Sequence, residues 1–124
     1  MKTILIVDDS KTIRQMLRRA LKADYAILEA SDGREALSVI KGIVPEAVIS
    51  DIHMPDVDGI TFISSVRSDP ALKNLPILVL TTENEYEFKQ RARAAGATAW
   101  LQKPFDDVTV QLALEKMLGV NPKE

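Results

Sequence analysis

The sequence contains no cysteine, which excludes disulfide bonds, thiol catalysis and zinc sites built from cysteine ligands. It contains a single histidine, His53, which excludes metal centres with several histidines and leaves few options for a Ser-His catalytic triad. Apolar runs of the roughly 18 to 20 residues needed to cross a bilayer are absent. The first apolar run, Ile4 to Val7, is too short for a signal peptide. We therefore expect a cytoplasmic protein with no membrane partner.

A large charge excess of either sign is also missing. The chain has 16 Lys and Arg residues and 18 Asp and Glu residues, which gives a formal net charge of −2. Nucleic-acid-binding proteins usually carry a strong basic excess, so we expect no nucleic-acid partner. The length of 124 residues and the 46% apolar content fit one ordinary globular domain. We expect residues 1–124 to form that single domain, with no room for a second, effector domain.

Short β-branched runs alternate along the chain with longer amphipathic stretches. The short runs predict five strands, at residues 4–7, 25–30, 47–49, 76–80 and 97–101. Each is followed by a stretch that predicts a helix, because its apolar residues recur three and four positions apart. The predicted helix caps are Ser10, Asp32 with Glu35, Asn84 with Glu87, and Asp106, and the predicted stops are Gly96 and Gly119. This alternation predicts a doubly wound α/β domain: a five-stranded parallel sheet with five helices on its two faces.

Polar side chains follow four of the five predicted strands. They are Asp8 and Asp9, Asp51, Thr81 and Thr82, and Lys103. In open α/β sheets the site lies just beyond the carboxyl ends of the strands, so we expect these side chains to converge on one rim. The second strand ends in Ala30 and Ser31, which offer nothing distinctive.

This set of residues suits phosphoryl transfer to a carboxylate. Three clustered carboxylates repel one another unless a cation joins them or one takes a proton. Ligands that are all oxygen favour a hard cation such as Mg²⁺. A carboxylate can act as a nucleophile and form an aspartyl phosphate. Lys103 and Thr81 would then supply a positive charge and a hydroxyl donor to the phosphoryl oxygens.

As a set, these motifs resemble the response-regulator receiver domain over roughly residues 2 to 119. The motifs are Asp8-Asp9, Asp51 with Met54-Pro55 and Gly59, Thr81, and Lys103-Pro104-Phe105. Residues 81–83 and 96–101 look most like chemotaxis-type stand-alone regulators. The resemblance implies a flavodoxin-like fold with strand order 2-1-3-4-5, which periodicity alone does not give.

The resemblance also implies a role for each site residue. Asp51 would accept the phosphoryl group, and Mg²⁺ would be held by Asp8, Asp9, Asp51 and the main-chain carbonyl of His53. Lys103, whose bond to Pro104 would be cis, would bind the phosphoryl group. Thr81 would move toward it, and Trp100, where the family usually has Tyr or Phe, would turn inward. That movement changes the surface formed by the fourth helix, fifth strand and fifth helix.

We therefore expect a phosphorylation-controlled binding switch rather than a turnover enzyme. Its donor would be a sensor histidine kinase, and its target a separate protein such as a flagellar motor switch protein, in chemotaxis or motility control. The family docks kinases through the first helix, where Arg14, Arg18, Arg19 and Lys22 form a charged face that we otherwise expect to be solvated.

Three alternatives stay open. A phosphorelay carrier would pass the phosphoryl group on to a histidine phosphotransfer protein. A phosphatase with an aspartate nucleophile generally has Asp-x-Asp after its first strand, whereas this chain has Asp8-Asp9-Ser10. A flavodoxin-type flavin carrier needs a phosphate-cradling loop after that strand, and the acids there would repel the phosphate.

Overall fold

The apolar runs form one parallel sheet in the order β2-β1-β3-β4-β5. The computed structural model describes residues 1–52, 54, 58–82 and 86–119. The strands are β1 (Lys2–Val7), β2 (Tyr25–Ala30), β3 (Ala47–Asp51), β4 (Ile77–Thr81) and β5 (Ala99–Gln102). The helices are α1 (Lys11–Leu21), α2 (Gly33–Gly42), α3 (Gly59–Arg67), α4 (Tyr86–Ala95) and α5 (Asp107–Leu118), with a 3₁₀ turn at Pro70–Leu72. The predicted alternation and the strand order implied by the resemblance are both confirmed.

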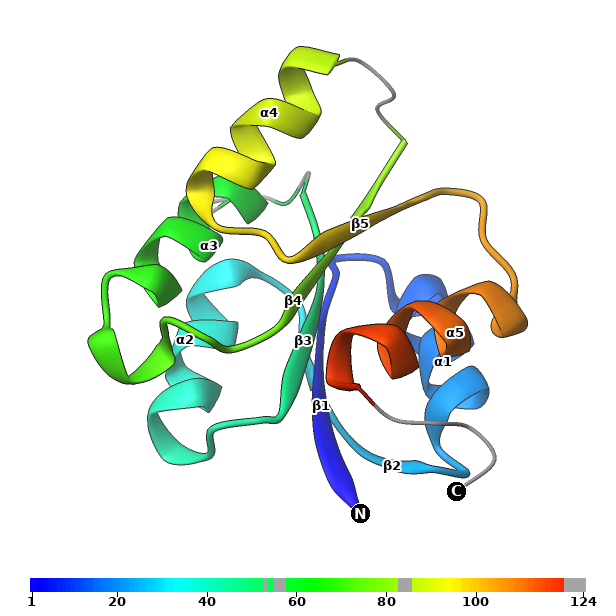
Figure 1. Cartoon of the computed structure of the whole chain (residues 1–124). Coiled ribbons are helices and arrows are strands. Elements are labelled where there is room, and N and C mark those ends of the chain that lie inside the picture. The colour runs from blue at the N-terminus through cyan, green and yellow to red at the C-terminus, as the bar shows by residue number, and fades with distance from the viewer. Residues whose placement is uncertain (53, 55–57, 83–85, 120–124) are drawn as a thin grey trace.

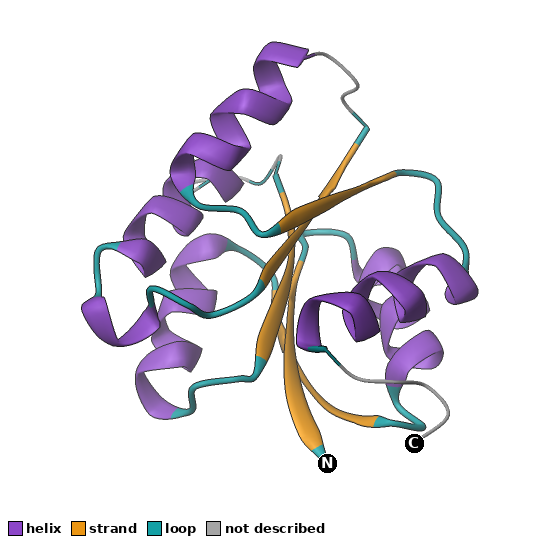
Figure 2. Ribbon diagram, in the orientation of Figure 1, coloured by secondary structure: helices purple, strands orange, loops and turns teal. Residues whose placement is uncertain are grey.

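Helices cover both faces of the sheet (Figures 1 and 2). Helices α1 and α5 pack on one face, and α2, α3 and α4 pack on the other. A hydrophobic core lies on each face of the sheet, and successive β1 residues point to the two cores alternately. Ile4 and Ile6 face α1 and α5, while Leu5 and Val7 face the layer of α2, α3 and α4. A sheet buried on both sides leaves its carboxyl edge as the place where polar side chains can gather.

Side-chain caps begin most of the helices, as predicted. The Ser10 hydroxyl accepts a hydrogen bond from the Ile13 amide at 3.2 Å, and Asp32 accepts one from the Glu35 amide at 2.8 Å. Asp106 caps α5 through the Thr109 amide at 2.7 Å. The predicted cap at Asn84 lies outside the described residues. Gly119 ends α5 in the left-handed conformation, with φ of 68°.

Three strand starts differ from the prediction for identifiable reasons. Strand β1 begins at Lys2 rather than Ile4, because Lys2 and Thr3 already pair with Tyr25 and Ala26 of β2. Strand β4 begins at Ile77 rather than Pro76, because proline has no amide hydrogen to give to the sheet. Strand β5 begins at Ala99 rather than Ala97, because the Ala97 amide still bonds to the Ala92 carbonyl of α4 at 3.0 Å. Among the helices of the described residues, none combines the length and apolar character needed to span a bilayer.

Candidate functional site

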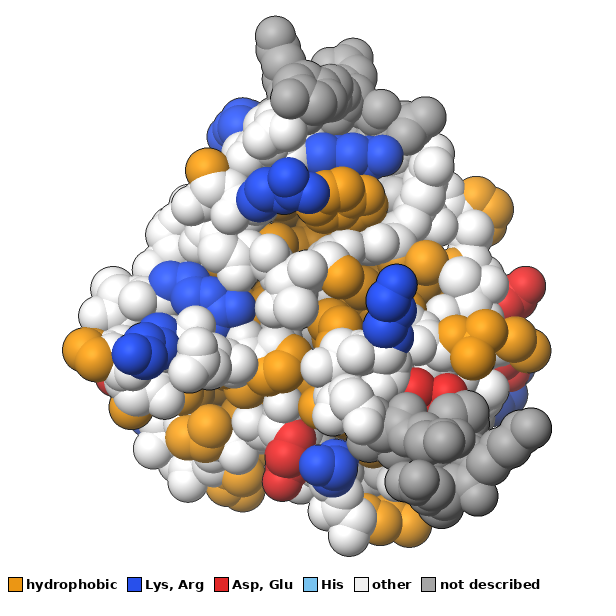
Figure 3. Space-filling model, viewed as in Figure 1, with side chains coloured by type: hydrophobic (Ala, Val, Ile, Leu, Met, Phe, Trp, Pro, Cys, Tyr) orange, Lys and Arg blue, Asp and Glu red, His pale blue; other side chains and the backbone are white. Residues whose placement is uncertain are grey.

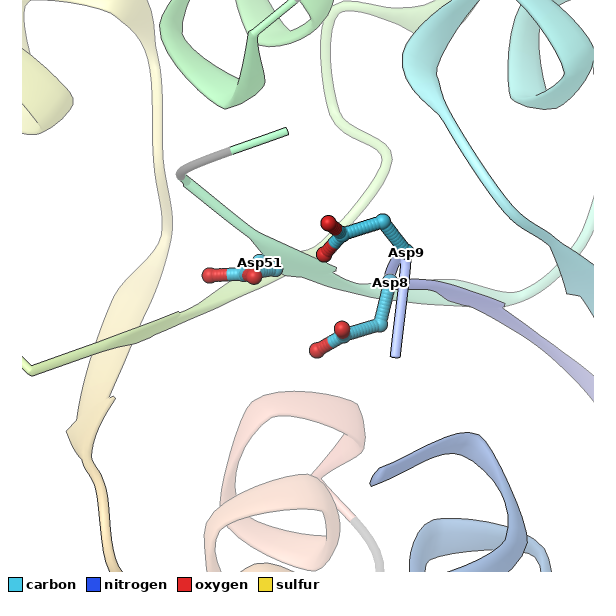
Figure 4. A group of neighbouring side chains, drawn as sticks. All are labelled: Asp8, Asp9 and Asp51. Atoms are coloured by element: carbon cyan, nitrogen blue, oxygen red, sulfur yellow. The ribbon is translucent and has the colours of Figure 1, made fainter. Parts of the chain in front are cut away.

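Three carboxylates meet at the carboxyl edge of the sheet (Figure 4). Asp8 directly follows β1, and Asp51 is the last residue of β3. Each of Asp8, Asp9 and Asp51 can offer one oxygen such that the three atoms lie within 4.8 Å of one another. Asp8 and Asp51 are buried, at 0% and 6% exposure, while Asp9 is exposed to solvent. The strands therefore bring together the acids that the sequence predicted would converge.

Asp8 is held on several sides. Its backbone amide donates to the Ala30 carbonyl at 3.1 Å, and its Oδ1 accepts a hydrogen bond from the Ser10 amide at 2.8 Å. Burial raises the pKa of Asp8, and the nearby charge of Asp51 raises it further, against the lowering effects of Ser10 and Lys103. A cation bound at this place would oppose both effects, because it favours the ionised carboxylate.

The end of β3 fixes Asp51. Its Oδ1 accepts a hydrogen bond from the Ile52 amide at 2.7 Å, and its carbonyl accepts one from the Ser50 hydroxyl at 2.8 Å. Behind it, the Gly59 amide donates to the Ile52 carbonyl at 2.9 Å. A Cβ atom on Gly59 would lie 2.5 Å from the Asp51 carbonyl oxygen, so only glycine allows α3 to start this close to Asp51.

Lys103 joins two of the carboxylates. Its Nζ lies 3.5 Å from Oδ2 of Asp8 and 3.4 Å from Oδ2 of Asp51. Its backbone amide donates to the carbonyl of Thr81 at 2.9 Å, so the loop after β5 stays next to the end of β4. Thr81 is buried, and the bond between Lys103 and Pro104 is cis, as the resemblance implies.

The cluster fits a small divalent cation. Three carboxylates and one ammonium leave a formal excess of two negative charges around a shared space. The donors are all oxygen, and Mg²⁺ is commonly held by one or two carboxylates together with waters. The predicted contribution of the His53 carbonyl lies outside the described residues, so it stays a prediction.

Trp100 lies on β5 beside α4 and is half-buried. The Lys89 ammonium lies 5.6 Å and the Arg93 guanidinium 5.4 Å from the centre of its ring. Figure 3 shows basic side chains around an apolar patch in this part of the surface. Two cations over one indole favour the position that the ring holds here, outside the acidic cluster.

One pair of residues near the site was not predicted from the sequence. The basic face of α1 was expected to be solvated unless a kinase docks there, but Arg14 is only 17% exposed and is paired with Glu29 of β2 at 3.1 Å. Arg14 also donates from its guanidinium to the backbone carbonyl of Asp8, at 2.5 Å. The available signal was Glu29, the one charged residue inside an otherwise apolar predicted strand.

Comparisons with known proteins agree with this geometry. The family described as "Response regulator receiver domain" matches residues 4–115. Response regulator MprA of Mycolicibacterium vanbaalenii is 40% identical over 117 residues, which are 94% of this chain and 47% of MprA. Sensor histidine kinase CheAY of Helicobacter pylori is 37% identical over 105 residues, which are 82% of this chain and 13% of the kinase. The chain thus spans less than half the length of these curated relatives.

A solved structure matches over nearly its whole length. Chemotaxis protein CheY4 of Vibrio cholerae is 43% identical to this chain and superposes with a TM-score of 0.91. The match covers 94% of this chain and 98% of the CheY4 chain. Sequence and backbone therefore point to the same group of proteins as the site residues do.

Proposed function

The chain belongs to the response regulator receiver domain family, and we propose that it is a phosphorylation-controlled switch whose phosphoacceptor is Asp51. One observation carries this proposal. The Asp51 carboxylate has the Lys103 ammonium 3.4 Å away and can share a cation with Asp8 and Asp9. A nucleophilic carboxylate with positive charges close to it is what transfer of a phosphoryl group onto aspartate requires.

In the proposed reaction, an Asp51 oxygen attacks the phosphorus of a phosphohistidine on a sensor histidine kinase. A new O–P bond forms as the N–P bond breaks, and the electron pair stays on the imidazole, which takes up a proton. Bound Mg²⁺ would neutralise charge on the phosphoryl oxygens. Lys103 binds an equatorial oxygen, and attack of water later releases inorganic phosphate and restores the carboxylate.

The conformational response would begin at Thr81 and Lys103. Thr81 is the last residue of β4, and its carbonyl accepts a hydrogen bond from the Lys103 amide. Its hydroxyl is therefore suited to move toward the new phosphoryl oxygen and donate to it. Trp100 would then leave its position beside Lys89 and Arg93 and turn inward. Phosphorylation biases an equilibrium between two shapes, and the altered α4-β5-α5 surface is what a partner would read.

The partners follow from the same proposal. A pocket of about 290 Å³ lies beside the site, lined by Ile13, Met16, Thr82, Lys103, Pro104 and Phe105. Together with α1 it offers a mostly apolar place for the kinase to dock next to Asp51.

The likeness to a chemotaxis protein supports chemotaxis or motility control, with a flagellar motor switch protein as the target. We also propose that residues 1–124 act as one receiver unit in the cytoplasm.

Fluorescence of Trp100, the single tryptophan, tests the proposal. Mg²⁺ should change the emission, and acetyl phosphate added afterwards should change it again. An Asp51→Asn variant should keep part of the Mg²⁺ response and lose the response to acetyl phosphate. A response to acetyl phosphate that survives in Asp51→Asn contradicts the assignment of Asp51.

Transfer assays separate the switch from the phosphorelay carrier. A switch should bind its target more tightly when phosphorylated. Rapid return of the phosphoryl group to a histidine phosphotransfer domain, with no target that senses phosphorylation, would favour the carrier instead.

A further inference from the structure

Two arginines of α1 share one acidic partner but differ in what else they contact. Arg14 Nε lies 3.1 Å from Glu29 Oε1, and Arg18 forms a 2.7 Å ion pair with Glu29 Oε2. Arg14 also donates a hydrogen bond from its Nη1 to the carbonyl oxygen of Asp8, at 2.5 Å. Its side chain is 17% exposed, whereas that of Arg18 is 45% exposed.

The carbonyl that Arg14 binds belongs to the peptide joining Asp8 to Asp9. The orientation of this peptide decides where both carboxylates point. The amide of Asp8 is fixed by Ala30 and its carboxylate by Ser10, so the bond from Arg14 fixes the remaining backbone polar atom. Glu29 holds the other side of the same guanidinium, which limits its freedom to turn away.

We infer that Arg14, oriented by Glu29, is a positioning residue that sets the Asp8-Asp9 peptide for the divalent cation. This inference rests on the proposed function, because it concerns the same acidic cluster. Groups that hydrogen-bond to metal-binding residues typically affect metal affinity by about 10- to 100-fold. Arg14 reaches the ligands through their backbone, so we expect an effect at the lower end, about tenfold.

The sign of the effect separates positioning from simple charge. Removing a positive charge near a cation site should tighten Mg²⁺ binding if charge alone matters. Loss of positioning should weaken it. Arg18 provides the matched control, since Arg18→Gln removes the same charge from the same helix and the same acidic partner but leaves the bond to Asp8 in place.

The experiment measures Mg²⁺ affinity by titration calorimetry, without a phosphodonor, on the unsubstituted chain and its variants. Arg14→Gln should bind Mg²⁺ about tenfold more weakly, while Arg18→Gln should stay close to the unsubstituted chain. Arg14→Lys keeps the positive charge. It should also weaken binding, because one ammonium cannot reproduce the fork that reaches Glu29 and the Asp8 carbonyl together. Circular dichroism confirms that each variant is folded at the temperature of the titration.

The outcomes distinguish this inference from the proposed function. Unchanged or tighter Mg²⁺ binding in Arg14→Gln and Arg14→Lys, beside normal binding by the unsubstituted chain, overturns the positioning role alone. Equal weakening in Arg18→Gln also overturns it, because the effect would then come from the shared ion pair. Absence of Mg²⁺ binding by the unsubstituted chain overturns the proposed function and this inference together.

Discussion

Replacing Gly59 by alanine should loosen the fold directly behind the proposed phosphoacceptor. The added Cβ would lie 2.5 Å from the Asp51 carbonyl oxygen and 2.5 Å from the Ile52 Cα. Both atoms belong to the backbone, so the start of α3 must move away from β3 by roughly 1 Å to reach ordinary contact. Such overpacking lowers the free energy of unfolding by about 1 to 3 kcal/mol. Alanine also restricts the unfolded chain, which offsets up to about 1 kcal/mol of this loss. We expect a net loss of about 1 to 2 kcal/mol in the free energy of unfolding.

The same displacement should also slow the phosphorylation of Asp51. The clash involves the carbonyl of Asp51 itself, and a misplacement of about 1 Å can slow a reaction about 100-fold. We expect phosphorylation by acetyl phosphate to slow by about 10- to 100-fold in Gly59→Ala. Urea unfolding followed by circular dichroism gives the stability, and the Trp100 fluorescence transient gives the rate.

Gly42→Ala is the matched control. A Cβ at this position, the last residue of α2, meets nothing within 4 Å. Its only expected effect is to restrict the unfolded chain, which stabilises by about 0.4 to 1 kcal/mol. The two glycine-to-alanine changes should therefore have opposite signs. A Gly59→Ala variant as stable as the unsubstituted chain, with a normal rate, would refute the argument that the backbone contact positions Asp51.

Three further changes test other parts of the structure. Phe62→Ala removes a fully buried side chain of α3 and should lower the free energy of unfolding in urea by about 3 to 5 kcal/mol; a loss below about 1 kcal/mol would contradict the packing of that layer. Hydrogen bonds from the Thr109 hydroxyl and amide lower the pKa of Asp106 below its usual 3.8, so its ionised form stabilises the folded state. The advantage of the unsubstituted chain over Asp106→Asn should therefore be present above pH 3.8 and disappear as the pH falls through the lowered pKa, and a difference that does not depend on pH would exclude this linkage. Lys103→Ala should still take up some phosphate but lose phosphorylation-dependent target binding, and unaltered target binding would count against Lys103 as the coupling residue.

Hydrophobic periodicity was enough to predict the architecture because it reports burial. Runs such as Ile4 to Val7 have no polar side chain to expose, and they are short and rich in β-branched residues, which is typical of strands buried on both faces. The order of the strands in the sheet depends on the face and the edge at which each crossover helix packs, which periodicity does not give. The order was therefore predicted from the family resemblance. Strand ends were less predictable, because hydrogen bonds such as that from Ala97 to Ala92 decide them.

The acidic cluster was predictable because strand ends in a parallel sheet must share an edge. The hydrogen bond from Arg14 to the Asp8 carbonyl was not predictable. Every residue has a backbone carbonyl, so the sequence does not indicate which of them a side chain on a helix will bind. The cap of α3 was missed for a different reason. Asp58 accepts a hydrogen bond from the Thr61 amide at 2.8 Å, but in the sequence it follows a stretch rich in Pro and Asp, in which more than one residue could have been the cap.

Locating the phosphoryl group on the chain tests whether Asp51 is the phosphoacceptor. The unsubstituted chain and Asp51→Asn are incubated with radiolabelled acetyl phosphate, with and without Mg²⁺, and the label is mapped by peptide analysis. We expect a label that depends on Mg²⁺, is labile in alkali, maps to the peptide containing Asp51 and is absent from Asp51→Asn. A chain that stays unlabelled with Mg²⁺ present, or a label that persists in Asp51→Asn, would contradict this role of Asp51.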